Sequence, residues 1–282
     1  MKKIPSTKTT ENTQNDEAKK AIGIFDSGLG GLTILRQVHK ILPKENLIYF
    51  GDTAHVPYGS KSKKTVTRYS LDIAKFLESK NIKLILVACN TASALALNTL
   101  RKQIRTPLIG VIKAGARRAA AISKNRKILI LATQATIDSK AYPRALKNLN
   151  AKIKTLQVAC PLFVPVIENG FAKDEIAALA IKKYLMPVKK MSADTVILGC
   201  THYPLIKKSI ANFLGSKINL VDSSEEVAKS AEETLLRRGL LNPRGRGRVE
   251  IYASDCPLLF AKAARVILGK TKLKIKERKS NL

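Results

Sequence analysis

Residues 84–92 read LILVACNTA, and residues 195–203 read TVILGCTHY. Each stretch is an apolar run that ends in a cysteine, Cys89 or Cys200, with polar residues directly after it. An uninterrupted apolar run of this kind is typical of a strand that is buried on both faces of a parallel sheet. Ligands of such sheets bind just beyond the carboxyl ends of the strands. The repeat therefore predicts two similar halves whose thiols face one cleft.

Short apolar runs recur along the chain and alternate with segments of helical periodicity. The runs occupy residues 21–25, 47–50, 84–88, 108–111, 128–132, 154–158, 195–198 and 218–221. Apolar residues recur at helical spacing in residues 64–80, 92–101, 139–149 and 174–186. This alternation predicts an α/β fold with mostly parallel sheets flanked by helices. A length of 282 residues predicts one large domain or two modest ones.

The composition indicates in which compartment the protein works and whether a metal site is expected. No apolar run approaches the roughly 20 residues that a membrane-spanning helix needs. Residues 1–20 are polar and lack the apolar core of a signal peptide, so we expect a flexible polar arm on a cytoplasmic protein. The four cysteines form no C-x-x-C pair, and only three histidines accompany them. A metal site is therefore not expected.

The formal net charge of +30 is large. It permits binding to nucleic acid, anionic lipid or acidic metabolites. However, Lys and Arg are spread along the whole chain without interleaved aromatic residues, and they are densest in residues 270–282, which we expect to form a basic tail. This distribution favours a solvated basic surface over a nucleic-acid site, which stays open as an alternative.

Residues 23–32 read GIFDSGLGGL, a strand end followed by a glycine-rich turn. The turn lacks the G-x-G-x-x-G spacing of a dinucleotide site and the Lys-Ser/Thr ending of a P-loop, and Asp26 would repel a phosphate. The glycines allow a small ligand to approach the backbone closely, and amides at a helix start suit a carboxylate. Asp26 is either a group that assists a base or binds an ammonium, or a cap of the following helix.

Residues 50–61 read FGDTAHVPYGSK. Asp, Thr, Pro and Gly after an apolar run make an ordinary turn. The functional alternative is a substrate loop, in which Tyr58 and the backbone of Gly59 provide the contacts.

A lone cysteine after a strand is usually buried and inert. Two features favour reactivity at Cys89 and Cys200. Asn90-Thr91 and Thr201-His202 place polar groups directly after each thiol, where a core would continue with apolar residues. His202 can also act as an acid or base on a neighbouring thiol. The other two cysteines, Cys160 and Cys256, are each followed by Pro and are assigned structural roles.

Four segments, in this order and spacing, closely resemble the glutamate racemases of bacterial cell-wall synthesis. They are residues 23–32, 50–61, 87–92 (VACNTA) and 198–205 (LGCTHYPL). Further likeness lies in residues 132–142, 160–170 and 221–228, so that the resemblance runs from about residue 21 to 269. It implies two pseudo-symmetric α/β domains, residues 21–113 plus 223–269 and residues 114–222, with the active site in the cleft between them.

The resemblance also implies an isomerase that interconverts L- and D-glutamate without a cofactor and supplies D-glutamate for peptidoglycan. Cys89 and Cys200 match the two catalytic cysteines of its two-base mechanism, with Cys89 acting on D-glutamate and Cys200 on L-glutamate. Asp26 and His202 match the auxiliary acid/base groups, and Glu168 matches a carboxylate near the second thiol. The positions that match the substrate contacts are Asp26, Ser27, Tyr58, Gly59, Asn90, Thr91, Thr201 and His202.

Other activities and partners stay open at this point. An aspartate racemase would use a similar pair of thiols. Some members of the family regulate DNA gyrase as a second activity, which the positive charge would permit. The family resemblance further implies a homodimer. Lys113-Ala114 departs from the Glu-Pro that is more common in the family at the expected crossover between the domains.

Overall fold

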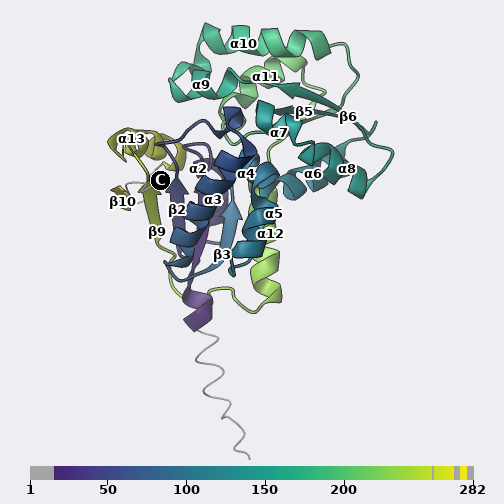
Figure 1. Cartoon of the computed structure of the whole chain (residues 1–282). Coiled ribbons are helices and arrows are strands. Elements are labelled where there is room, and N and C mark those ends of the chain that lie inside the picture. Colours follow the sequence, from purple (N-terminus) through teal and green to yellow (C-terminus); the bar gives the residue numbers. More distant parts are fainter. Residues whose placement is uncertain (1–15, 256, 270–273, 278–282) are drawn as a thin grey trace, which may run out of the picture.

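The computed structural model describes residues 16–255, 257–269 and 274–277, which fold into two α/β lobes (Figure 1). The first lobe contains a six-stranded sheet in the order β10-β9-β2-β1-β3-β4, and the second a four-stranded sheet in the order β6-β5-β7-β8. Every neighbouring pair of strands is parallel. The predicted α/β class with two similar sheets is therefore confirmed.

The strands of the first lobe are β1 (Ala21–Asp26), β2 (Leu47–Gly51), β3 (Ile82–Val87), β4 (Leu108–Gly110), β9 (Val249–Ala253) and β10 (Lys274–Glu277). Its helices are α2 (Leu32–Ile41), α3 (Lys63–Glu78), α4 (Asn90–Leu95), α5 (Leu97–Gln103), α12 (Ser224–Arg237) and α13 (Pro257–Leu268). A short 3-10 turn, η1 (Tyr58–Ser60), precedes α3.

The strands of the second lobe are β5 (Lys127–Ala132), β6 (Lys154–Ala159), β7 (Thr195–Gly199) and β8 (Asn219–Val221). Its helices are α7 (Gln134–Asp138), α8 (Ala141–Leu149), α9 (Phe163–Glu168), α10 (Glu175–Leu185) and α11 (Lys207–Leu214). The 3-10 turns η2 (Phe171–Lys173), η3 (Met186–Val188) and η4 (Tyr203–Ile206) connect them.

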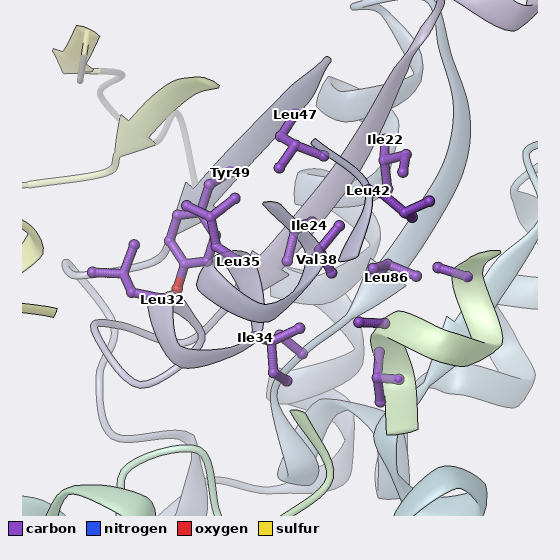
Figure 2. Close-up of a cluster of buried hydrophobic side chains, with 14 of the residues drawn as sticks. Ile22, Ile24, Leu32, Ile34, Leu35, Val38, Leu42, Leu47, Tyr49 and Leu86 are labelled. Carbon is purple, nitrogen blue, oxygen red and sulfur yellow. The ribbon is translucent and has the colours of Figure 1, made fainter. Parts of the chain in front are cut away.

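Successive side chains of β1 point alternately into the two cores of the first lobe. Ile22 and Ile24 point to the core that α2, α12 and α13 cover, and Phe25 points to the opposite core, under α3. Figure 2 shows the first of these cores, where Ile24 and Tyr49 of the sheet face the side chains of α2. Tyr49 also donates a hydrogen bond from Oη to the carbonyl of Gly28 (2.7 Å), which ties the glycine-rich turn to the sheet.

The helix α6 (Val111–Ile122) connects the lobes and belongs to both cores. Val111 and Ala114 pack in the first lobe, whereas Ala116 and Ala119 pack in the second. The helix continues without interruption through Lys113-Ala114. The boundary expected at residues 113/114 therefore falls inside a helix that the two lobes share, and the chain returns to the first lobe through α12.

Two expectations about the ends of the chain are corrected. Residues 16–19 of the expected arm are helical, and Ala18 is buried; residues 1–15 lie outside the described range. Part of the expected basic tail forms β10, which pairs with β9. Lysines that alternate with apolar residues suit an edge strand, because charged side chains discourage pairing with a further strand. None of the helices within the described ranges has both the length and the hydropathy that crossing a membrane requires.

A buried ion pair holds the first sheet together at the amino-terminal end of β3. Lys83 of β3 contacts Glu45, and both side chains are almost fully buried. Lys83 Nζ also donates to the carbonyls of Ala18 (2.5 Å) and Leu240 (2.9 Å), and Glu45 Oε1 accepts from the amide of Asn242 (2.8 Å). One ammonium thus ties three chain segments to β3.

Lys83→Met should lower the free energy of unfolding by about 3–5 kcal/mol, because it leaves the Glu45 carboxylate buried without its partner. Denaturant titration at neutral pH measures this loss. Lys182→Met on the exposed face of α10 is the matched control and should change stability by less than about 0.5 kcal/mol. Equal effects of the two substitutions would contradict the assignment.

Candidate active site

A small cavity lies between the lobes at the carboxyl ends of both sheets, and Cys89 and Cys200 both line it. The thiols follow β3 and β7, one strand from each lobe. The lining also includes Ser27, Pro57, Tyr58, Gly59, Asn90, Thr91, Thr133, Val164, Thr201 and His202. The structure therefore brings both cysteines and seven of the other expected residues to one place.

The cavity is closed. The space open to the centre of a water molecule is about 10 Å³, which is about what one water needs. Hydrogen bonds cross between the lobes beside it: Thr201 Oγ1 donates to Asp26 Oδ1 (3.2 Å), Tyr142 Oη donates to Asn90 Oδ1 (2.7 Å), and the hydroxyl of Thr91 lies 2.9 Å from that of Thr133 and 3.3 Å from that of Thr136. At this volume the cavity does not hold an amino acid.

Cys89 is held as a neutral thiol in this closed state. Its Sγ accepts a hydrogen bond from the amide of Ala92 (3.5 Å) and donates one to Ser27 Oγ (3.7 Å). Burial, together with the negative charge of Asp26, raises the pKa of Cys89 to about 12. The thiolate at this position is therefore a minor species until another charge stabilises it.

Asp26 holds the turn that follows β1 and does not cap α2, whose N-cap residue Gly31 has no side-chain cap hydrogen bond. Oδ2 accepts from the amides of Gly28 (3.2 Å) and Gly31 (3.0 Å), which fixes the glycine-rich turn. Oδ1 reaches across to Thr201 of the second lobe. Burial raises the pKa of Asp26, although His202 and these hydrogen bonds act in the opposite direction. A buried carboxyl with a raised pKa can accept and return a proton beside Cys89.

His202 joins Cys200 to Glu168. Its Nδ1 lies 3.7 Å from Cys200 Sγ, and its Nε2 lies 2.5 Å from Glu168 Oε1, although Glu168 does not line the cavity. Burial lowers the pKa of His202, but the hydrogen bonds to Cys200 and Glu168 outweigh it, so this pKa lies well above 6.5. The raised pKa favours the protonated imidazole, whose Nδ1 faces Cys200 Sγ.

Thr133 and Tyr142 contribute to the site but were not predicted from the sequence. Thr133 follows β5, lines the cavity, and belongs to a cluster of hydroxyls with Thr91 and Thr136. Tyr142 Oη donates to Asn90 Oδ1 (2.7 Å) and so orients that amide. Their signal was the likeness of residues 132–142, in which no single residue had been assigned a role.

The two other cysteines of the sequence are Cys160 and Cys256. Cys160 is fully buried in the core of the second lobe, and burial raises the pKa of its thiol, in keeping with a structural role. Cys256 lies outside the described residues. Among the residues that are described, no group of three His, Cys, Asp or Glu side chains is arranged to hold a metal ion.

Comparison with known proteins identifies the family. The family model described as Asp/Glu/Hydantoin racemase matches residues 29–231. The chain is 49% identical over 251 residues to the glutamate racemase of Geobacter metallireducens, covering 89% of this chain and 93% of that protein.

Solved structures of relatives agree. A glutamate racemase isoform of Bacillus anthracis superposes with a TM-score of 0.88 at 35% identity, covering 93% of this chain and 98% of that one. The glutamate racemase of Francisella tularensis, solved in complex with D-glutamate, gives a TM-score of 0.87 at 37% identity, covering 94% and 98%. This chain, with two thiols facing one closed cavity between its parallel sheets, belongs to the glutamate racemase family.

Proposed function

We propose that this chain interconverts L- and D-glutamate by proton transfer between Cys89 and Cys200. The observation that carries the proposal is that the two thiols come from different lobes and line one cavity. Inverting an α-carbon requires a base on one face and an acid on the other. Two thiols on opposite walls of a cavity meet this requirement without an electron-withdrawing cofactor.

In the direction from D- to L-glutamate, the Cys89 thiolate removes the α-proton, and the electron pair stays on the carbon. The Cys200 thiol then donates its proton to the opposite face, which leaves Cys200 as the thiolate and Cys89 as the thiol. The enzyme is now in the form that accepts L-glutamate, so the reverse reaction uses the same two steps in the opposite order. The assignment of each thiol to one enantiomer rests on the family resemblance.

The two sides of the cavity can support these steps differently. Asp26 provides a carboxylate near Cys89, and His202 lies within reach of Cys200 to act as its acid or base. Glu168 holds the imidazole of His202 in place. Ser27, Asn90, Thr91 and Thr201 provide the hydroxyl and amide groups that bind the ammonium and carboxylates, together with Tyr58 and Gly59.

Opening and closing of the lobes are part of this cycle. Glutamate enters an open form, and closure then removes water from the carbanion-like state. D-Glutamate made in this way serves peptidoglycan synthesis. The resemblance supports work in the cytoplasm, where thiols stay reduced, and assembly as a homodimer. No observation favours aspartate as substrate, or nucleic acid or gyrase as a partner.

Cys89→Ala and Cys200→Ala should each lower the rate of racemisation by about 10²–10⁴-fold or more, because each removes one acid/base group. Circular dichroism of L- or D-glutamate incubated with the purified variants measures the loss. Cys160→Ala is the matched control and should retain activity within about threefold, since that thiol is buried and does not line the cavity. Full activity in either active-site variant would reject the two-thiol assignment, and faster turnover of aspartate would reject the substrate.

Gly30→Ala should keep the lobes from closing. Its new Cβ would lie 2.3 Å from Thr201 Oγ1 and 2.8 Å from His202 Nδ1, so the lobes must move apart by about 1 Å, which lowers kcat by roughly 10²-fold. Gly245→Ala is the control: at φ +88° it strains the backbone but meets no atom within 4 Å. It should lower the melting temperature without changing kcat, and a kcat of Gly30→Ala that matched this control would contradict the closure.

A further inference from the structure

The proposed proton transfer does not use Asp52, a buried carboxylate behind the wall of the cavity. Asp52 directly follows β2 and is 1% exposed. Tyr58 Oη donates to its Oδ2 (2.5 Å), and Ser254 Oγ donates to its Oδ1 (2.8 Å). His55 Nδ1 lies 2.9 Å from Oδ1 and 3.0 Å from Oδ2. Because a carboxylate only accepts hydrogen bonds, the Nδ1 of His55 carries a proton.

The strand order explains how these groups meet. β2 lies between β1 and β9, so Asp52 and Ser254 follow adjacent parallel strands at the same edge of the sheet. The amide of Asp52 also donates to the carbonyl of Asp26 (3.0 Å), which follows the pairing of β2 with β1. Asp52 is thus anchored on both sides by residues at the ends of neighbouring strands, Asp26 of β1 and Ser254 after β9.

Tyr58 connects Asp52 to the cavity. Its side chain is 1% exposed, and it lines the cavity together with Gly59. Gly59 packs so closely on the second lobe that an added Cβ would lie 2.5 Å from Thr133 Cβ. The turn η1 is therefore held between Asp52 on one side and the second lobe on the other.

Aromatic rings support the same turn from behind. The His55 ring stacks on Tyr69 of α3 with centroids 4.1 Å apart, and the Tyr58 and Tyr69 rings lie 5.8 Å apart. The ring of Tyr58 thus contacts Tyr69, and its hydroxyl is held by Asp52. A hydrogen bond from a phenol to a carboxylate is charge-assisted and stronger than a neutral one.

We propose that Asp52 is a positioning residue of the active site, which holds the Tyr58 hydroxyl and thereby sets the place of η1 at the cavity wall. It acts through Tyr58, because it does not line the cavity itself. The inference rests on the proposed racemase reaction and names a further residue that this reaction needs. Ser254 and His55 also hydrogen-bond the carboxylate and keep it from turning away from Tyr58.

The test compares Asp52→Asn, Tyr58→Phe and the double variant in the full chain. An amide at residue 52 cannot accept from all three donors, and Phe at residue 58 removes only the hydroxyl. Each single variant should raise KM for both enantiomers about tenfold while kcat falls less, since η1 contacts the substrate but not the reacting atoms. The double variant should be no worse than the more severe single one, because both break the same bond.

Three results would overturn the inference: an unchanged KM in Asp52→Asn, effects of the two substitutions that multiply in the double variant, or a fall in kcat alone. If Asp52→Asn fails to fold, the variants Tyr58→Phe and Ser254→Ala test the inference in its place. Tyr58→Phe should then raise KM about tenfold, and Ser254→Ala, which weakens the anchoring of Asp52, should raise it less. An unchanged KM in Tyr58→Phe rejects the inference.

Asp194→Asn is the matched control. Asp194 also accepts several hydrogen bonds, from Ser123 Oγ (2.7 Å) and the amides of Lys124 (2.7 Å) and Asn125 (2.8 Å). It precedes β7, whereas Cys200 follows that strand, about 20 Å away at roughly 3.3 Å per residue. This variant should lose stability with no change in KM, which separates positioning from a general structural effect.

Tyrosine titration by absorbance gives a readout that does not depend on activity. Burial, followed by the charge and hydrogen bond of Asp52, holds the pKa of Tyr58 well above 10. Asp52→Asn removes the charge, so one tyrosine should ionise at lower pH than in the wild type, and this change should be missing when Tyr58→Phe is added. Wild-type protein without racemase activity would reject the proposed function and the inference with it. If the wild type is active but Asp52→Asn changes neither KM nor the tyrosine titration, the inference alone is rejected.

Discussion

Thr201 of one lobe donates a hydrogen bond to Asp26 of the other, and this contact brings the two walls of the cavity together. The remaining features of the site depend on it. Asp26 simultaneously fixes the glycine-rich turn, and Thr201 lies directly between Cys200 and His202 in sequence, so one bond sets the relative position of both acid/base groups. Gly30 is required at this contact because a side chain there would meet Thr201 and His202.

The two halves are similar in fold but not in chemistry. Each thiol follows a parallel strand, yet a carboxylate lies near Cys89 and an imidazole lies beside Cys200. Burial makes a charge expensive on both walls. The carboxylate of Asp26 therefore disfavours a thiolate at Cys89, and a thiolate there needs another charge nearby to stabilise it.

The sequence predicted the parts of the structure that depend on local pattern. The strands before Cys89 and Cys200 were recognised because runs buried on both faces carry no polar residue. In contrast, β9 and β10 were missed because glutamate and lysine interrupt their apolar residues, and β10 was interpreted as a charged tail. Ser254, which follows β9, could therefore not be placed beside Asp52. Thr133 and Tyr142 were missed because their roles depend on which lobe faces which, and that depends on tertiary contacts alone.

The helix α6 has a consequence for the whole molecule. Its first turn is part of one core and its last turns are part of the other, so neither lobe has a complete interior without it. The two lobes are therefore coupled in folding, since both cores contain side chains of this helix. Cutting the chain at this helix would yield two fragments with incomplete cores, instead of two independent halves.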